Sequence, residues 1–178
     1  MPRVLVACPT CEGKDYALEE WWGAYQSFTW PDRQAFMADN TGGTLSYTHR
    51  LRKLGIPADH VEPLGDFWDT MELSWRLIVE RALLCGCRYV ASIEADVVCP
   101  PEALDVLLEH AGGHRVVAHW YPDRESGTPI ASIGCALIET DWLAATVCDW
   151  WQSAEDEIMG SGRNFEIRDR LIIRHLDG

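Results

Sequence analysis

Residues 88–110 read RYVASIEADVVCPPEALDVLLEH, and this stretch decides the fold that the sequence predicts. Its first part, Tyr89–Ile93, is short, apolar and rich in β-branched and aromatic side chains, which is typical of a strand buried on both faces in a parallel sheet. Pro100 and Pro101 follow closely, and a proline in the first turn of a helix loses no hydrogen bond. The stretch therefore predicts a buried strand, a short connection and a helix.

Two acidic residues stand where this predicted strand ends. Glu94 and Asp96 are separated only by Ala95, and because side chains alternate along an extended chain, both carboxylates should point to the same side. Ligands of open α/β sheets bind at the carboxyl ends of the strands. Two carboxylates on one side need a metal ion, a basic partner or water. A solvated strand end is the plainer interpretation, but the neighbouring strand and helix signals favour a ligand site.

The length and composition indicate one globular domain. A chain of 178 residues has the size of a single domain, so we expect one domain over residues 1–178. Its 47% hydrophobic and 24% charged residues are ordinary for such a domain. No apolar run approaches the roughly 20 residues of a membrane span, and too few residues precede the first predicted strand for a secretory signal. These features predict a cytoplasmic protein.

The net charge of −13 bears on the class of partner. An acidic protein repels nucleic acid and anionic membranes at long range. The nearest approaches to a basic cluster are residues 49–53 and 163–174, and other residues dilute both of them. The charge therefore disfavours a nucleic-acid partner without excluding a local basic groove.

The seven cysteines raise the alternative of a zinc site, because two pairs are close in sequence. Cys8 and Cys11 end the first predicted strand, whereas Cys85 and Cys87 precede the central one. If these strands are parallel, the pairs lie at opposite ends of the sheet, about 15–20 Å apart. We therefore expect small buried thiols, kept reduced in the cytosol, and a redox role for the first pair is the lesser alternative.

Strand-like and helix-like segments alternate from the start of the chain to at least residue 118, which predicts an α/β fold. The expected architecture is a mostly parallel sheet with helices on both faces. The predicted strands cover residues 3–8, 34–38, 59–64, 89–93, 115–120, 130–138 and 170–176, and the predicted helices cover residues 16–28, 44–54, 66–85, 100–110 and 140–158.

The first, second and fourth strands all finish in polar residues, which should lie along one edge of the sheet. No Gly-x-Gly-x-x-Gly follows any predicted strand, and no Walker lysine loop is present. These absences argue against a dinucleotide-binding fold and against a P-loop enzyme.

In the order and spacing of these features the chain resembles a compact glycosyltransferase of the GT-A fold. It is similar to the large inverting family-2 group and to short bacterial and phage relatives. The resemblance covers nearly the whole chain, and Glu94 stands where the family has the first Asp of Asp-x-Asp. The residues that carry it are 4–10, 36–40, 93–96, 132–138, 154–156 and 174–176.

The resemblance implies a set of roles. Asp96 and His175 would bind a divalent metal, Mn²⁺ or Mg²⁺, and Asp156 with Glu155 would act on the acceptor, Asp156 as the general base. The nucleotide-diphosphate sugar that serves as donor would be bound by Pro9, Thr10, Glu12, Asp39, Asn40 and Glu94.

The chemistry of the implied reaction suits these residue types. A divalent metal stabilises the charge that develops on a leaving diphosphate, and both Mg²⁺ and Mn²⁺ prefer oxygen ligands. A histidine ligand would tilt the preference towards Mn²⁺. An acceptor hydroxyl needs a base within reach of its proton, unless the reaction retains configuration. The inverting reaction is the one that the resemblance implies.

Two other functions stay open at the level of sequence. A sugar nucleotidyltransferase shares much of this fold, although Cys11-Glu12-Gly13-Lys14 matches its first loop poorly. A non-catalytic α/β binding or assembly module would leave all these acids as solvated surface. For a glycosyltransferase, a saccharide or small-molecule acceptor is slightly favoured over a hydroxylated DNA base. Because the chain is short, we expect a separate acceptor domain to be either absent or supplied by a partner subunit, for example in a homo-oligomer.

Overall fold

The computed structural model describes residues 1–122, 129–146, 165–167 and 171–176. These residues form a seven-stranded sheet in the order β3-β2-β1-β4-β7-β6-β8 and a separate two-stranded sheet of β5 and β9. The strands are β1 (Val4–Thr10), β2 (Arg33–Asp39), β3 (Ala58–His60), β4 (Tyr89–Ile93), β5 (Val97–Val98), β6 (Val116–Pro122), β7 (Pro129–Glu139), β8 (Phe165–Ile167) and β9 (Arg174–His175). The helices are η1, a 3₁₀ helix (Glu12–Ala17), α1 (Leu18–Ser27), α2 (Ser46–Lys53), α3 (Phe67–Leu84), α4 (Ala103–Glu109) and α5 (Thr140–Thr146).

The large sheet is mostly parallel, which confirms the predicted architecture. Strands β3, β2, β1 and β4 are parallel to one another, and β6 is parallel to β8. Strand β7 runs antiparallel to both of its neighbours, β4 and β6. The predicted central strand has the bounds that the structure shows, and all five of its residues are buried, as expected for a strand inside a parallel sheet.

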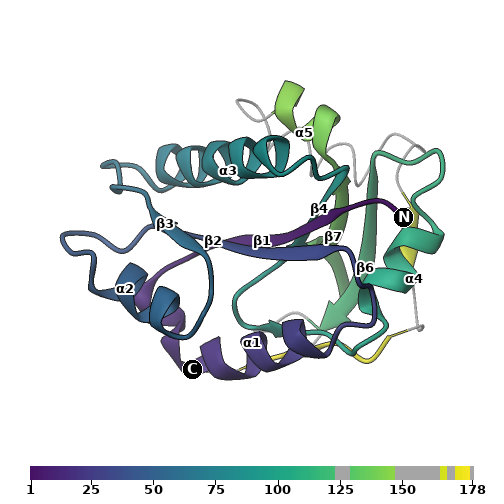
Figure 1. Ribbon diagram of the computed structural model, residues 1–178, viewed down its shortest axis with the longest axis horizontal. Coiled ribbons are helices and arrows are strands. Elements are labelled where there is room, and N and C mark those ends of the chain that lie inside the picture. Colours follow the sequence, from purple (N-terminus) through teal and green to yellow (C-terminus); the bar gives the residue numbers. More distant parts are fainter. Residues whose placement is uncertain (123–128, 147–164, 168–170, 177–178) are drawn as a thin grey trace.

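Two hydrophobic layers cover the two faces of this sheet. Alternate residues of β1 divide between them: Val4 and Val6 pack in the layer that contains α1, whereas Leu5 and Ala7 pack in the layer that contains α3. Figure 1 shows α3 and α5 over one face of the sheet and α1 and α2 over the other. Helices therefore lie on both faces, as the sequence predicts.

The long helix α3 begins and ends where its sequence indicates. The Asp66 side chain accepts hydrogen bonds from the first backbone N–H groups of the helix, which is the preferred N-cap arrangement. Gly86 follows the helix with a φ of +65°, a left-handed conformation that glycine adopts without steric cost. None of the described helices is both long enough and apolar enough to cross a membrane.

Several predicted boundaries are wrong, and each has a local cause. The predicted helix 16–28 is a 3₁₀ helix followed by α1, because the chain turns back towards the strand ends at residues 12–17. Helix α4 begins at Ala103 rather than at Pro100, since Ala103 N donates to Pro100 O in a preceding turn. The predicted strand 59–64 is only three residues long. The predicted helix 140–158 is described as far as Thr146.

The two cysteine pairs lie at opposite ends of the sheet, as predicted. Strands β1 and β4 are parallel, so Cys8 lies at the carboxyl end and Cys87 just before the amino end. Six cysteines within the described residues are free thiols, and Cys148 lies outside those residues. Burial raises the pKa of Cys87 to about 11 and that of Cys8 further still. Buried thiols of this kind are inert, since the reactive form is the thiolate.

Candidate active site

The polar residues that follow β1 and β2 lie side by side. In the parallel ladder Thr10 is the partner of Asp39, and the next residue, Asn40, donates its backbone N–H to Thr10 O over 2.8 Å. The third polar segment follows β4, which is the other neighbour of β1. The carboxyl ends of three adjacent parallel strands therefore form one polar edge, as the sequence predicts.

Glu94 and Asp96 lie in a tight turn after β4. Val97 N donates to Glu94 O over 2.9 Å and closes the turn, while Glu94 N donates to Gly134 O of β7 over 3.0 Å. The two carboxylates do converge, but the turn brings them together and not the alternation of an extended strand. Asp96 is fully buried, and such a carboxylate needs partners to offset its charge.

His175 completes this cluster from β9. Strand β9 pairs antiparallel with β5, so that His175 lies opposite Val97, and Leu176 N donates to Asp96 O over 2.8 Å. His175 Nε2 is 3.3 Å from Asp96 Oδ2. The predicted strand 170–176 is therefore not a strand of the main sheet: in the described part of the chain β9 pairs with β5 in a sheet of its own, while Leu171 and Ile173 before it pack in the hydrophobic layer that contains α1.

The donor set of this cluster suits a divalent cation. Ligand atoms of Glu94, Asp96 and His175 all lie within 4.8 Å of one another. Two carboxylates and one imidazole are ligands that Mn²⁺ accepts and that Mg²⁺ tolerates less well because of the nitrogen. Within the described ranges this is the one such group of three or more histidine, cysteine or acidic side chains, so the four-cysteine zinc alternative has no support there.

Two further residues contact Asp96, and neither is among the predicted site residues. Lys14 Nζ forms an ion pair with Asp96 Oδ2, and Tyr16 Oη donates to the same oxygen over 3.1 Å. Both residues belong to η1. Of the two, only Lys14 had a signal in the sequence, because a lysine in the loop after the first strand is a feature of sugar nucleotidyltransferases.

The two carboxylates of the cluster differ in their electrostatics. Burial and the nearby charge of Asp96 raise the pKa of Glu94 above its ordinary value. Burial acts in the same direction on Asp96, but the hydrogen bond and charge of Lys14, together with His175, outweigh it and lower the pKa of Asp96. Asp96 is therefore the anionic centre of the cluster, and Glu94 is the carboxyl group that gains most from an added cation.

A cavity of about 260 Å³ opens beside the cluster. Its walls combine backbone and side chains of the β1 end with apolar side chains from α3, of which Phe67 is 62% exposed at the rim. Five of the residues predicted as site residues line it: Pro9, Thr10, Asn40, Glu94 and Asp96. Lys14 lines it as well.

Asp39 and Glu12 do not line this cavity. The Asp39 carboxylate is fully buried and accepts hydrogen bonds from Thr41 N over 2.9 Å and from Thr48 Oγ1 over 2.5 Å. Glu12 is exposed and its backbone N–H donates to Thr41 Oγ1 over 2.8 Å. Both residues hold the loop after β2 in place, and their direct contact with a nucleotide stays a prediction. Glu155 and Asp156 lie outside the described residues.

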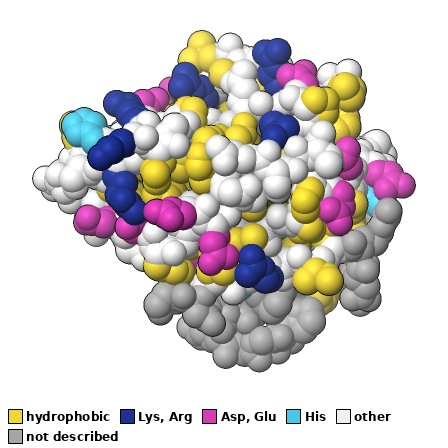
Figure 2. All heavy atoms as spheres, turned by 60° about the horizontal axis from the view of Figure 1, so that its bottom comes forward, with side chains coloured by type: hydrophobic (Ala, Val, Ile, Leu, Met, Phe, Trp, Pro, Cys, Tyr) yellow, Lys and Arg dark blue, Asp and Glu magenta, His cyan; other side chains and the backbone are white. Residues whose placement is uncertain are grey.

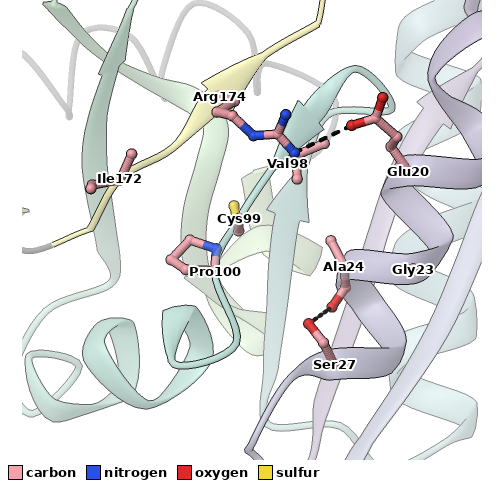
Figure 3. Close-up of a pocket in the computed structure, with 9 residues that line it drawn as sticks. All are labelled: Glu20, Gly23, Ala24, Ser27, Val98, Cys99, Pro100, Ile172 and Arg174. Carbon is pink, nitrogen blue, oxygen red and sulfur yellow. Dashed lines mark hydrogen bonds and ion pairs between the residues drawn. The ribbon is translucent and has the colours of Figure 1, made fainter.

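A second hollow, of about 430 Å³, lies on the other side of β5, between α1 and β9. Figure 3 shows Arg174 of β9 extending towards Glu20 of α1, and the two side chains form an ion pair over 3.2 Å. Both side chains are more than half exposed, so the pair contributes little by itself. It adds to the β5–β9 ladder that positions His175.

Comparison with solved structures identifies the fold. The mannosyltransferase PcManGT from Pyrobaculum calidifontis, in complex with GDP-Man and Mn²⁺, superposes with a TM-score of 0.67 at 16% identity, over 94% of this chain and 55% of that chain. The chain has a GT-A-like fold. TarS residues 1–349 from S. aureus, in complex with UDP-GlcNAc, give 0.67 at 14% identity, over 99% of this chain and 59% of that chain. This GT-A-like chain therefore spans little more than half the length of either of these two chains.

The same GT-A-like fold also occurs in a nucleotidyltransferase. A 4-diphosphocytidyl-2C-methyl-D-erythritol synthase superposes with a TM-score of 0.66 at 16% identity, over 96% of this chain and 90% of that chain. No family model matches the sequence, and no curated protein matches it. Likeness at these identities establishes the fold, and the reaction has to be argued from the site.

Proposed function

We propose that the chain is a metal-dependent glycosyltransferase that moves a sugar from a nucleotide-diphosphate sugar to an acceptor hydroxyl. The observation that carries the proposal is the cluster of Glu94, Asp96 and His175, because Glu94 and Asp96 line a cavity at the carboxyl ends of β1 and β4. Two solved structures of similar fold contain GDP-Man with Mn²⁺ and UDP-GlcNAc. A cavity that has a cation site at one wall is suited to a diphosphate group.

The residues of the cluster take distinct roles in this proposal. Asp96 and His175 hold the cation, and Glu94 adds a second carboxylate or binds the ribose. When bound, the cation offsets the negative charge that develops on the leaving diphosphate. The cavity of about 260 Å³ is near the lower end of the usual size of a small-molecule site, and its apolar wall from α3, with Phe67 and Met71, suits a base or a sugar ring.

The acceptor side of the proposal rests on Asp156 as the general base, with Glu155 beside it, in an inverting reaction. The acceptor is a saccharide or a small molecule in preference to a hydroxylated DNA base, because the net charge is −13 and an acidic surface repels a polyanion. On the face that Figure 2 shows, Lys and Arg side chains are interspersed with Asp and Glu, so the described part of this face offers no broad basic surface for DNA. A change in anomeric configuration of the product would test the inverting reaction.

A sugar nucleotidyltransferase is the second candidate, and two observations favour it. Lys14 lies in the loop after β1, lines the cavity and pairs with Asp96, so that a lysine does reach the site as this reaction requires. The chain also covers most of the length of the synthase of similar fold. Both candidate reactions use a nucleotide as donor. The glycosyltransferase breaks the bond between the sugar carbon and the diphosphate oxygen, whereas the nucleotidyltransferase breaks the bond between the α and β phosphates of a nucleoside triphosphate.

One assay separates the candidates. The purified protein is incubated with a panel of nucleotide sugars and hydroxyl acceptors (saccharides and small molecules), and in parallel with nucleoside triphosphates and sugar phosphates, with and without Mn²⁺. Mn²⁺-dependent release of a nucleoside diphosphate is the expected result, whereas release of pyrophosphate would identify the nucleotidyltransferase. Asp96→Asn, which keeps the shape of the side chain and removes its charge, is the matched control. A protein that releases neither product over the whole panel would overturn both enzymatic functions and leave the binding module.

A further inference from the structure

Lys14 places a positive charge where a metal ion would bind. Its ammonium group contacts Asp96 Oδ2, the same oxygen that faces His175 Nε2 at 3.3 Å and accepts from Tyr16 Oη at 3.1 Å. A single oxygen of a fully buried carboxylate therefore serves an ammonium, an imidazole and a phenol at once. The position next to this oxygen is already taken by a cation.

A metal ion shared by Asp96 and His175 needs the same space. Two cations beside one carboxylate oxygen repel each other, and the repulsion is strong because the site is buried and poorly screened. The ammonium and the metal therefore exclude one another at Asp96 Oδ2. The lysine is the group that can leave, because its side chain is 35% exposed whereas that of Asp96 is 0% exposed.

We propose that Lys14 is a displaceable internal cation, which neutralises Asp96 in the ligand-free protein and is expelled when a divalent metal binds. The inference rests on the metal site of the proposed function. Lys14 lines the cavity, so the displaced ammonium stays at the cavity wall, where it can pair with the phosphates of a bound nucleotide. Metal alone must break the ion pair, whereas metal with a diphosphate offers the ammonium a new partner, so the two ligands should bind cooperatively.

The chain offers a direct test, because Lys14 and Lys53 are its only lysines. Lys53 is exposed at the end of α2 and serves as an internal control. The wild-type protein is treated with an amine-reactive acylating reagent, with and without Mn²⁺, and the extent of labelling at each lysine is measured by peptide mass spectrometry. Mn²⁺ should accelerate labelling of Lys14 several-fold and leave Lys53 unchanged. Labelling of Lys14 that stays the same at saturating Mn²⁺ would overturn the proposal, since the metal would then bind without moving the lysine.

A second measurement follows the metal. Lys14→Met keeps the length of the side chain and removes its charge, and Lys53→Met is the matched control. Mn²⁺ binding measured by calorimetry should be about tenfold tighter in Lys14→Met, which corresponds to about 1.4 kcal/mol, and unchanged in Lys53→Met. Equal affinity in all three proteins, or no binding by any of them, would overturn the proposal.

Neither measurement uses a nucleotide sugar, so their outcome is separable from that of the proposed function. If Mn²⁺ releases Lys14 while the substrate panel gives no product, the proposed displacement of Lys14 is supported and the proposed glycosyltransferase function is contradicted. If the panel gives Mn²⁺-dependent product while the labelling of Lys14 is unaffected, the glycosyltransferase function is supported and the displacement of Lys14 is contradicted.

Discussion

The Asp39 carboxylate offers a sharp test of how the loop after β2 is held. Asp39 is fully buried and accepts one hydrogen bond from Thr41 N and one from Thr48 Oγ1, while His60 Nδ1 lies 3.8 Å away. Asp39→Ala removes both acceptors at once. It also leaves the hydroxyl of Thr48, a residue that is 2% exposed, without this partner in the interior.

The expected loss of stability follows from these contacts. A hydrogen bond to a charged group contributes about 1.5–3 kcal/mol, so two of them set an upper bound of about 3–6 kcal/mol. Burying the carboxylate has a desolvation cost, and removing the carboxylate relieves that cost, so the net loss of stability is smaller than the upper bound. We therefore expect Asp39→Ala to lower the free energy of unfolding by about 3 kcal/mol, a large part of the roughly 5–15 kcal/mol of a typical domain.

Urea unfolding followed by tryptophan fluorescence measures this change. The matched control is Asp59→Ala on the neighbouring strand β3, whose carboxylate is 46% exposed and pairs with Arg52 over 2.6 Å. That exposed pair should contribute less than about 1 kcal/mol. Equal losses in the two variants would refute the reasoning, because burial would then make no difference. Asp39→Asn, measured for nucleoside diphosphate affinity, tests the separate prediction of a nucleotide contact, whose loss should weaken binding by about 1–3 kcal/mol.

Three further predictions concern the Glu94–Asp96–His175 cluster and the cavity. Asp96→Asn should abolish saturable Mn²⁺ binding in calorimetry. The same variant should be less stable than the wild type above pH 3.8, because the pKa of Asp96 is lowered from 3.8 and its carboxylate therefore stabilises the fold. The free energies of unfolding of the two proteins, measured in urea, should converge as the pH falls below that value. His175→Ala should weaken Mn²⁺ binding about tenfold or more, whereas His49→Ala, at an exposed histidine, should leave it unchanged. Equal Mn²⁺ affinities of the two variants would show that His175 is not a ligand. Cys11 and Cys85 are both half-buried thiols, but of the two only Cys11 lines the cavity near β1. A nucleoside diphosphate should therefore slow the alkylation of Cys11 and leave that of Cys85 unchanged. Protection of both thiols, or of neither, would place the nucleotide elsewhere.

The parts of the fold that local pattern determines could be predicted from the sequence. The buried strand at Tyr89–Ile93 and the long helix capped by Asp66 follow from apolar periodicity and capping chemistry, which act over a few residues. The grouping of Thr10, Asp39 and Glu94 at one edge follows from parallel pairing alone. These features need no knowledge of distant contacts.

The composition of the site could be predicted only in part, because its contacts are long-range. Lys14 and Tyr16 reach Asp96 across 82 and 80 positions of the chain, and they do so because residues 12–17 form a 3₁₀ helix rather than the start of an α-helix. An aromatic residue at the start of an apolar stripe gave no sign of this turn. The buried carboxylate of Asp39 likewise depends on a hydrogen bond from Thr48 of α2, and the sequence around either residue does not predict this contact.

The two-stranded sheet of β5 and β9 has a consequence for the order in which the molecule assembles. Arg174 and Glu20, which help to hold β9, are 154 positions apart, and contacts that close such long loops carry a large entropic cost and tend to form late in folding. A pairing that is only two residues long and lies near the end of the described chain is also among the first to open in the native state. An ion that bridges Asp96 and His175 would bind the closed form alone and so draw this equilibrium towards closure. The backbone N–H of Leu176 donates to Asp96 O, so its rate of hydrogen exchange with solvent would report how often this last pairing opens. Slower exchange in the presence of Mn²⁺ would show how strongly the metal stabilises the closed form.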